Sequence, residues 1–361
     1  MPQYNYVNEA VIKHFTEKTG RKIVSVDQDT LSEFSATTLV RDKLLTNYAI
    51  EYHPMGYVAD QAAPRIQVPE KHGLIYNGSV NAMKRHRTNS AQGLGKPNQI
   101  SRERQADGSY TLMPYALMTP VTKGEIEAAK RNGGPGIGPM EDAVQFLKDV
   151  MAVDREYRVL VELVNTSTFT NHSDMSTGTT IYQYWDDQTD GAPIEVIKRA
   201  KKLIPFECGQ RATHMLWPSH IRDAFYTHTK VKSWRNESQD YVSGLTDQKV
   251  GMVMGLKSID ADAMAIAEQE LATAGHTADF NYIIGNNAAV LSIPNSPSRH
   301  APYAMATMAM GKPNVKYVRD EFIDGGDGGY WIILTEAKMQ EKVIDVGCAH
   351  VITNVLEHPT T

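Results

Sequence analysis

The chain has 361 residues, of which 41% are hydrophobic and 22% are charged, a composition typical of globular rather than disordered or fibrous proteins. Its formal net charge of −5 excludes a general attraction of the whole chain to nucleic acid. Two cysteines are too few for a disulfide framework, and each is expected to be a small buried side chain. No signal peptide is recognisable and no apolar run could cross a bilayer, so we expect a protein without membrane contact, made in a cytoplasm.

The pattern of the chain changes after residue 60. Residues 1–60 hold two short helical patterns, at 11–18 and 39–45, without a closed core, so they are predicted to form an N-terminal arm. Beyond them the pattern becomes extended, and strands are predicted at residues 65–69, 73–76, 110–113 and 115–118.

A polar segment, residues 83–109, separates these strands and has no periodic apolar face. A segment of this length between two strands is usually either functional or disordered. It is also basic, because only Glu103 and Asp107 oppose six basic residues: Lys84, Arg85, Arg87, Lys96, Arg102 and Arg104. In a chain of negative net charge these six residues form a local positive arm.

A long helix follows this arm. After a short helix at residues 124–131, apolar periodicity begins at Pro139 and continues for about 27 residues, roughly 40 Å at the helical rise. This length and the wide apolar stripe indicate a structural spine. Four glycines precede it and predict a hinge: Gly133, Gly134, Gly136 and Gly138. They do not form a dinucleotide-binding loop, because a polar helix precedes them instead of a strand.

The remainder of the chain mixes helices and strands. Helices are predicted at residues 193–203 and 260–275, the second with Asp260 as its N-cap. Residues 282–284 and 289–291 are predicted to pair as a hairpin around a Gly-Asn-Asn turn. The C-terminal part is mostly strand, with runs at residues 315–322, 330–335, 342–346 and 350–356. The predicted fold class is α+β.

The sequence contains no residue pattern typical of an active site. Its twelve histidines include no His-Glu-x-x-His pair, there is no Gly-x-Ser-x-Gly motif, and neither Cys208 nor Cys348 has a marked partner. The acidic residues at 260–262 and 324–327 fit a helix start and a turn better than a cation site. We therefore expect no catalytic residue, no metal site and no cofactor.

Several short segments of the sequence resemble, in the same order, segments of one known protein family. Residues 63–68 resemble the strand entry to an extended loop, 184–200 a tryptophan-then-helix passage, 282–287 a late hairpin and 346–355 a pair of closing strands, while 214–218 and 228–231 match more loosely. Together with the order of the elements, these phrases resemble the Hong Kong 97-type fold of the major capsid proteins of tailed bacteriophages, in particular the lambda-like family.

The resemblance implies an α+β Hong Kong 97-like capsid fold with five parts. These are an N-terminal arm (1–60), an extended-loop or E-loop arm (61–122), the spine helix with the first part of the peripheral or P domain (123–190), the axial or A domain (191–312) and the closing strands of the P domain (313–361). It further implies that the six basic residues contact neighbouring subunits. The four glycines would let the spine helix change direction between a precursor shell and an expanded one.

The function that the resemblance implies is that of a major capsid protein, which catalyses nothing. Its copies would form pentamers and hexamers of an icosahedral shell that encloses double-stranded DNA without sequence-specific binding. The implied partners are a separate scaffolding protein, a portal and a decoration protein, and the implied location is the virion capsid, assembled in the bacterial host cytoplasm. Two alternatives stay open, the shell protein of an encapsulin-type nanocompartment and a soluble enzyme of unrecognised fold.

Overall fold

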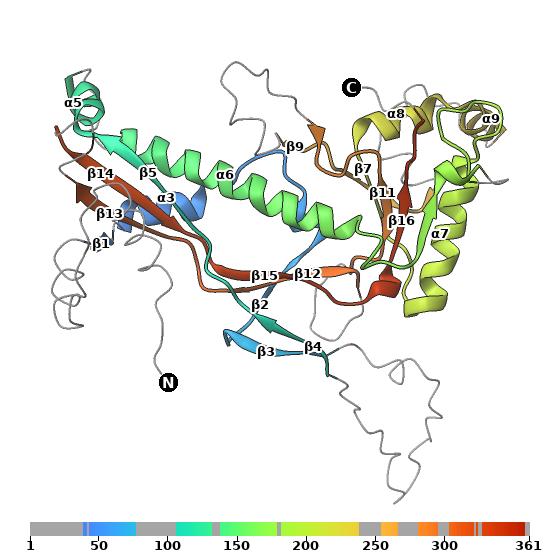
Figure 1. Cartoon of the computed structure of the whole chain (residues 1–361), viewed down its shortest axis with the longest axis horizontal. Helices are drawn as coiled ribbons and strands as arrows, with labels where there is room; N and C mark the ends of the chain where they lie inside the picture. The colour runs from blue at the N-terminus through green and yellow to red at the C-terminus, as the bar shows by residue number, and fades with distance from the viewer. Residues whose placement is uncertain are drawn as a thin grey trace, which may run out of the picture.

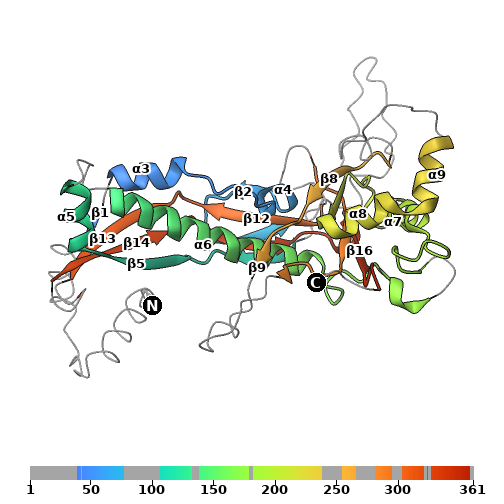
Figure 2. The same cartoon turned by 90° about the horizontal axis from the view of Figure 1, so that it is seen from above.

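The computed structural model describes residues 39–41, 43–76, 106–131, 138–178, 182–237, 254–265, 281–294, 303–320, 323 and 327–357. They form an elongated α+β frame, along which helix α6 (Gly138–Leu163) runs (Figure 1). Helix α6 has 26 residues, which confirms the long helix predicted from the periodicity. A sheet with helices packed on it lies toward each end of the frame, and a smaller sheet lies between them (Figures 1 and 2).

The first sheet is four-stranded and antiparallel. Its order is β1 (Leu39–Arg41), β13 (Asn314–Asp320), β14 (Gly329–Thr335) and β5 (Ala116–Thr122), and helix α5 (Lys123–Arg131) follows β5. Helices α3 (Lys43–Glu51) and α6 share a core with this sheet, which includes Leu45, Leu147 and Ile332. The helix predicted at residues 39–45 is wrong at its start, because residues 39–41 pair with β13 and the helix begins only at Lys43.

The middle of the frame carries a three-stranded sheet in the order β15 (Lys338–Val343), β12 (Met305–Met310) and β2 (Arg65–Gln67). Helix α4 (Ala59–Ala62) precedes β2. A separate antiparallel pair, β3 (His72–Tyr76) and β4 (Ala106–Thr111), projects from the frame (Figure 1). This pair confirms that two strands flank the basic segment of the sequence.

The far sheet is five-stranded, in the order β6 (His172–Asp174), β16 (Ala349–Thr353), β11 (Ala288–Leu291), β7 (His214–Trp217) and β8 (Lys257–Asp260). Three helices accompany it, α7 (Pro193–Cys208), α8 (Ser219–Thr227) and α9 (Thr229–Glu237), and two 3-10 turns adjoin it, η2 (Met175–Thr177) and η5 (Val346–Cys348). In its core, the ring of Phe225 packs between those of Trp185 and Trp217, with centroids 5.8 and 5.4 Å away.

Two predictions for this region are wrong. Residues 260–265 are not helical, since β8 ends at Asp260 and β9 (Met264–Ala265) pairs with β10 (Asn281–Tyr282); residues 266–275 lie outside the described part. Nor do residues 282–284 and 289–291 pair with each other, because β11 lies between β7 and β16. Strand β11 is completely buried, so its backbone groups need hydrogen-bond partners on both sides.

The sheets combine strands from distant parts of the chain. Strand β12 falls in the range 191–312, given above as the A domain, but joins the middle sheet. Strand β16 falls in the range 313–361, given above as the closing strands of the P domain, but joins the far sheet. Within the described residues, no helix combines the length and the apolar character that crossing a membrane requires.

Candidate functional site

The predicted contact residues lie outside the described part of the chain, namely Lys84, Arg85, Arg87, Lys96, Arg102 and Arg104. So do Gly133, Gly134 and Gly136, whereas Gly138 is the first residue of α6. The contact role and the hinge therefore stay predictions. The described residues show how α6 is fixed to α4 and the middle sheet, and which of its apolar side chains stay exposed.

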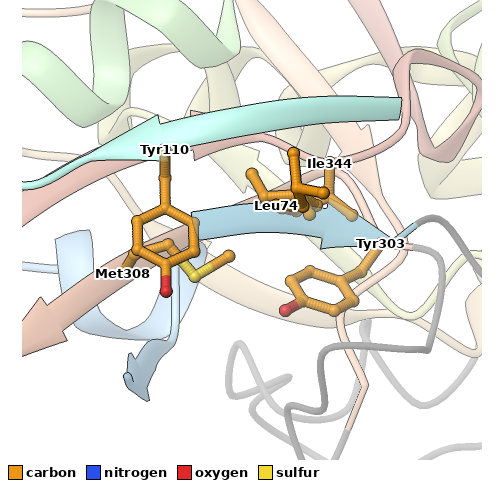
Figure 3. A pocket seen from close by; sticks show the side chains of 6 residues that line it. Leu74, Tyr110, Tyr303, Met308 and Ile344 are labelled. Carbon is orange, nitrogen blue, oxygen red and sulfur yellow. The ribbon is translucent and has the colours of Figure 1, made fainter. Parts of the chain in front are cut away.

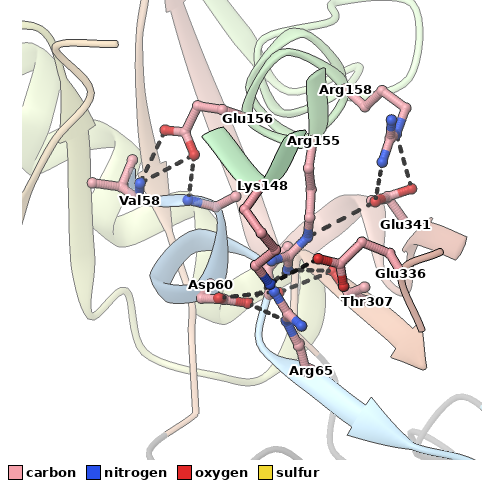
Figure 4. A network of polar contacts seen from close by, with 12 residues as sticks. Val58, Asp60, Arg65, Lys148, Arg155, Glu156, Arg158, Thr307, Glu336 and Glu341 are labelled. Atoms are coloured by element: carbon pink, nitrogen blue, oxygen red, sulfur yellow. Dashed lines mark hydrogen bonds and ion pairs between the residues drawn. The ribbon is translucent and has the colours of Figure 1, made fainter. Parts of the chain in front are cut away.

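A cluster of ion pairs, which we call the α6 junction, fixes α6 to helix α4 and to the middle sheet (Figure 4). Arg155 lies at its centre and is 7% exposed. Its Nη2 atom lies 2.7 Å from Oδ1 of Asp60 on α4, and donates a hydrogen bond of 3.3 Å to Thr307 on β12. Its Nε atom lies 4.0 Å from Oε1 of Glu341 on β15. One arginine thus connects the long helix to three other elements.

The other members of the α6 junction are Arg65, Arg158 and the two acids. Arg65, the first residue of β2, donates a hydrogen bond of 2.7 Å to Asp60. Burial opposes ionisation of Asp60, but the hydrogen bonds and charges of the two arginines prevail and lower its pKa. Arg158 lies 3.2 Å from Glu341 and stacks over the ring of Tyr115, 4.1 Å from its centroid. Arginines of α6 and acids of α4 and β15 thus hold the helix and the neighbouring elements together.

Glu156, the next residue of α6, binds the start of helix α4. It is fully buried, and its carboxylate accepts hydrogen bonds from the backbone N–H groups of Val58 at 3.0 Å and Ala59 at 2.7 Å. These N–H groups belong to the start of α4, where a carboxylate is a favourable partner. Burial raises the pKa of Glu156 in spite of these bonds. Sequence patterns could not reveal this cap, because 97 positions separate Glu156 from Ala59.

A stripe of exposed apolar side chains runs along α6. It consists of Phe146, Val150, Tyr157 and Val161, whose exposed fractions are 59%, 40%, 51% and 37%. The spacings place all four side chains on one side of the helix, and we call them the α6 seam. Apolar side chains that share one exposed side of a helix make this side a candidate interface.

A Ser–His pair in the far sheet resembles a nucleophile with its base. Oγ of Ser173 lies 2.8 Å from Nε2 of His350, and the two residues are 5% and 2% exposed. Burial lowers the pKa of His350 to about 4, so the imidazole is neutral at pH 7. Its Nδ1 atom has no hydrogen-bond partner among the described residues, so no third group orients the ring. Because no substrate reaches this depth, the pair is a structural hydrogen bond.

The described residues contain no group of three side chains suited to hold a metal ion. A cavity of about 10 Å³ lies at the root of the β3–β4 pair and is lined by Leu74, Tyr110, Tyr303 and Met308, among others (Figure 3). A space of this size holds one water molecule and no organic cofactor. Burial raises the pKa of Tyr303, so this tyrosine is not a base.

Comparison with known proteins gives a match in structure alone. No protein-family model matches the chain, and no curated protein matches it. A phage-related protein from Bordetella bronchiseptica RB50 has a TM-score of 0.67 at 15% identity, over 89% of this chain and 99% of that chain. A protein assigned as a prophage capsid protein in Escherichia coli CFT073 has a TM-score of 0.51 at 8% identity, over 88% of this chain and 99% of that chain.

The SrpI encapsulin of Synechococcus elongatus PCC 7942 covers 89% of this chain at 11% identity, but with a TM-score of 0.41 this likeness supports no argument. The two stronger matches extend over most of this chain and nearly the whole of each matched chain. At 15% and 8% identity they show the fold alone. The chain therefore has the fold of phage capsid proteins, the α+β fold that the phrases in its sequence implied.

Proposed function

We propose that this protein is the major capsid protein of a tailed bacteriophage, whose copies form the icosahedral head that encloses double-stranded DNA. The observation that carries the proposal is the fold, which phage proteins share over almost their whole length. The frame supports it as well, since an elongated subunit with a projecting strand pair can contact several neighbours (Figure 1). The α6 seam adds apolar surface that another copy of the chain would cover.

In this proposal the shell consists of pentamers and hexamers, assembled in the host cytoplasm with a scaffolding protein, a portal and a decoration protein. The β3–β4 pair would be the root of the E-loop, and α6 with the first and middle sheets would form the P domain. The far sheet with α7, α8 and α9 would form the A domain. The subunit would bind no cofactor and catalyse no reaction.

The proposal is tested by expressing the full chain, with and without the products of neighbouring genes, and imaging the purified material by negative-stain electron microscopy. Closed particles of uniform size are expected, and nucleic acid is expected in particles from infected or induced cells. Particles that enclose an enzyme instead would favour the nanocompartment alternative. A monomer that stays monodisperse at high concentration would contradict any role in a shell.

Placing aspartate at both Phe146 and Tyr157 is expected to prevent shell formation while the subunit stays folded. Both side chains are more than half exposed in the subunit, at 59% and 51%, so the change removes little core packing. In an interface, each aspartate would be buried without a partner and cost at least about 2 kcal/mol per contact. Sedimentation velocity measures assembly, and circular dichroism measures folding.

The matched control is Met55→Asp, which places the same charge on a side chain that is 95% exposed in the turn between α3 and α4. This variant is expected to assemble as the unchanged protein does. Shells of normal yield from the double α6 seam variant would show that the stripe takes no part in assembly.

Replacing both Arg85 and Arg87 with glutamate is also expected to leave the subunit folded but to block or misdirect assembly. One exposed ion pair contributes less than about 1 kcal/mol, but a shell repeats the contact in every subunit and needs each in register. High salt should slow early assembly for the same reason, because it screens exposed charges. Sedimentation across a salt series tests both expectations. The control is the double variant Lys130→Glu with Arg131→Glu, at the exposed end of α5. Equal yields of shells from the two double variants would show that the basic arm takes no part in assembly.

A further inference from the structure

The two cysteines of the chain, 140 positions apart in sequence, meet in the folded protein. Cys208 is the last residue of α7, and Cys348 is the last residue of η5, which leads into β16. The two thiols lie close enough that each shifts the pKa of the other, that of Cys208 downward and that of Cys348 upward. Both thiols are buried, but Cys208 is 7% exposed and Cys348 not at all, so Cys208 is the one nearer to the solvent.

The backbones that carry the two thiols are pressed together. A Cβ atom on Gly347 would lie 2.9 Å from Cβ of Glu207, so only glycine allows η5 to pack this closely against the last turn of α7. Both ends are also capped. Gly209 closes α7 in the left-handed conformation, with φ 71°, and Asp345 accepts a hydrogen bond of 2.9 Å from the N–H of Gly347. These contacts hold the two cysteines in place.

We propose that Cys208 and Cys348 form an intramolecular disulfide when the protein meets a small disulfide such as oxidised glutathione. The Cys208 thiolate displaces one glutathione thiolate and forms a mixed disulfide. Cys348 then loses its proton and attacks the Cys208 sulfur, which releases the second glutathione. Two protein thiols are oxidised to one S–S bond, and one glutathione disulfide is reduced to two glutathione thiols, which take up the two protons.

The environments of the thiols set this order of events. The Cys348 thiol lowers the pKa of Cys208, and the backbone N–H of Gln210 acts in the same direction. The Cys208 thiol, together with burial, raises the pKa of Cys348. Attack by the more acidic and more exposed thiol, followed by resolution by the buried one, is the usual sequence for a redox-active pair.

The disulfide would tie the end of α7 to β16 and close a long loop, which stabilises a protein by restricting its unfolded chain. A further consequence rests on the proposed function. The thiols would stay reduced during assembly in the cytoplasm and become oxidised when particles reach an oxidising medium. Particles would then be more resistant to unfolding after release than before it.

The experiment treats the reduced full-length protein with oxidised glutathione, then denatures it and alkylates its free thiols. A mass loss of about 2 Da, no alkylated thiol and a higher thermal unfolding midpoint are expected, all reversed by a reducing agent. Two alkylated thiols after this treatment, or a disulfide-linked dimer, would overturn the proposal. The thiol assay needs no shell, so its outcome is independent of whether the chain assembles.

Single serine variants test the roles of the two thiols. Cys348→Ser keeps Cys208, the less deeply buried thiol, and is expected to collect one glutathione adduct that is never resolved. Cys208→Ser keeps only the buried Cys348 and is expected to stay unmodified in the native protein. Equal adduct formation in the two variants would overturn the assigned order of attack.

Discussion

Replacing Arg155 with alanine is expected to lower the free energy of unfolding by about 3–5 kcal/mol. The arginine is 7% exposed and is the member of the α6 junction that contacts both Asp60 and Glu341. Its removal leaves Glu341, whose side chain is 7% exposed, with Arg158, 3.2 Å away, as its one remaining cation in the α6 junction. A buried carboxylate that loses a partner is costly, and the cavity left by the side chain adds to the loss. Urea unfolding of unassembled subunits, followed by circular dichroism, measures the change.

Two further variants separate the causes. Arg131→Ala removes an ion pair of 3.6 Å with Glu127 on the exposed end of α5, where the arginine side chain is 80% exposed, and is expected to cost less than about 1 kcal/mol. Arg155→Met keeps most of the packed volume and removes the charge and the hydrogen bond to Thr307. If Arg155→Ala costs no more than Arg131→Ala, the α6 junction does not stabilise the frame as described.

Acidification from pH 7 to pH 4 is expected to destabilise the subunit, and His350 is a principal cause. Burial, with help from the charges of His172 and Arg199, lowers the pKa of His350 from 6.5 to about 4. Because its pKa is lower in the folded state, the unfolded chain binds the proton first as the pH falls. The contribution of neutral His350 to the free energy of unfolding is therefore complete above about pH 6.5. It is lost progressively toward pH 4, by roughly 3 kcal/mol in all. Burial and the charge of Lys257 shift the pKa of His214, on strand β7 of the same sheet, to about 4 as well, which adds a smaller loss because this ring is partly exposed.

Urea unfolding at a series of pH values tests this expectation on a matched pair of variants. His350→Gln can keep the hydrogen bond to Ser173 but cannot become charged, so it should lose less stability between pH 7 and pH 4 than the unchanged protein. Ser173→Ala removes the hydrogen bond and keeps the titrating imidazole, so its acid loss should persist. An acid dependence of His350→Gln equal to that of the unchanged protein would rule out His350 as the cause.

The elements that the sequence determined by itself are those with strong local patterns. Helix α6 follows from apolar periodicity over its whole length, and the strands on either side of the basic arm follow from short β-branched and aromatic runs between turn residues. The order of these elements also implied the α+β capsid fold that the solved structures confirm. Such patterns are readable because each residue needs only its near neighbours in the chain to express its preference.

Tertiary structure decided the pairing of strands and the burial of side chains. Residues 39–41 became a strand beside β13, and β11 took partners from β7 and β16 instead of its neighbour in sequence, because backbone groups in a buried strand must be satisfied wherever a partner lies. The apolar stripe of α6 is wider than the sheet beneath it can cover, so Val144 and Leu147 are buried while Phe146 and Tyr157 stay exposed.

The contacts of Arg155 and of the two cysteines were likewise decided by the tertiary structure. Arg155 meets Thr307 across 152 positions, and Cys208 meets Cys348 across 140, distances in sequence over which no local pattern carries information. Ion pairs, caps and thiol pairs act only over a few ångströms. They therefore form only when the chain folds, and they produce no periodic pattern in the sequence. The sequence by itself therefore determined which elements form and in what order, and only the tertiary structure decided which side chains meet between them.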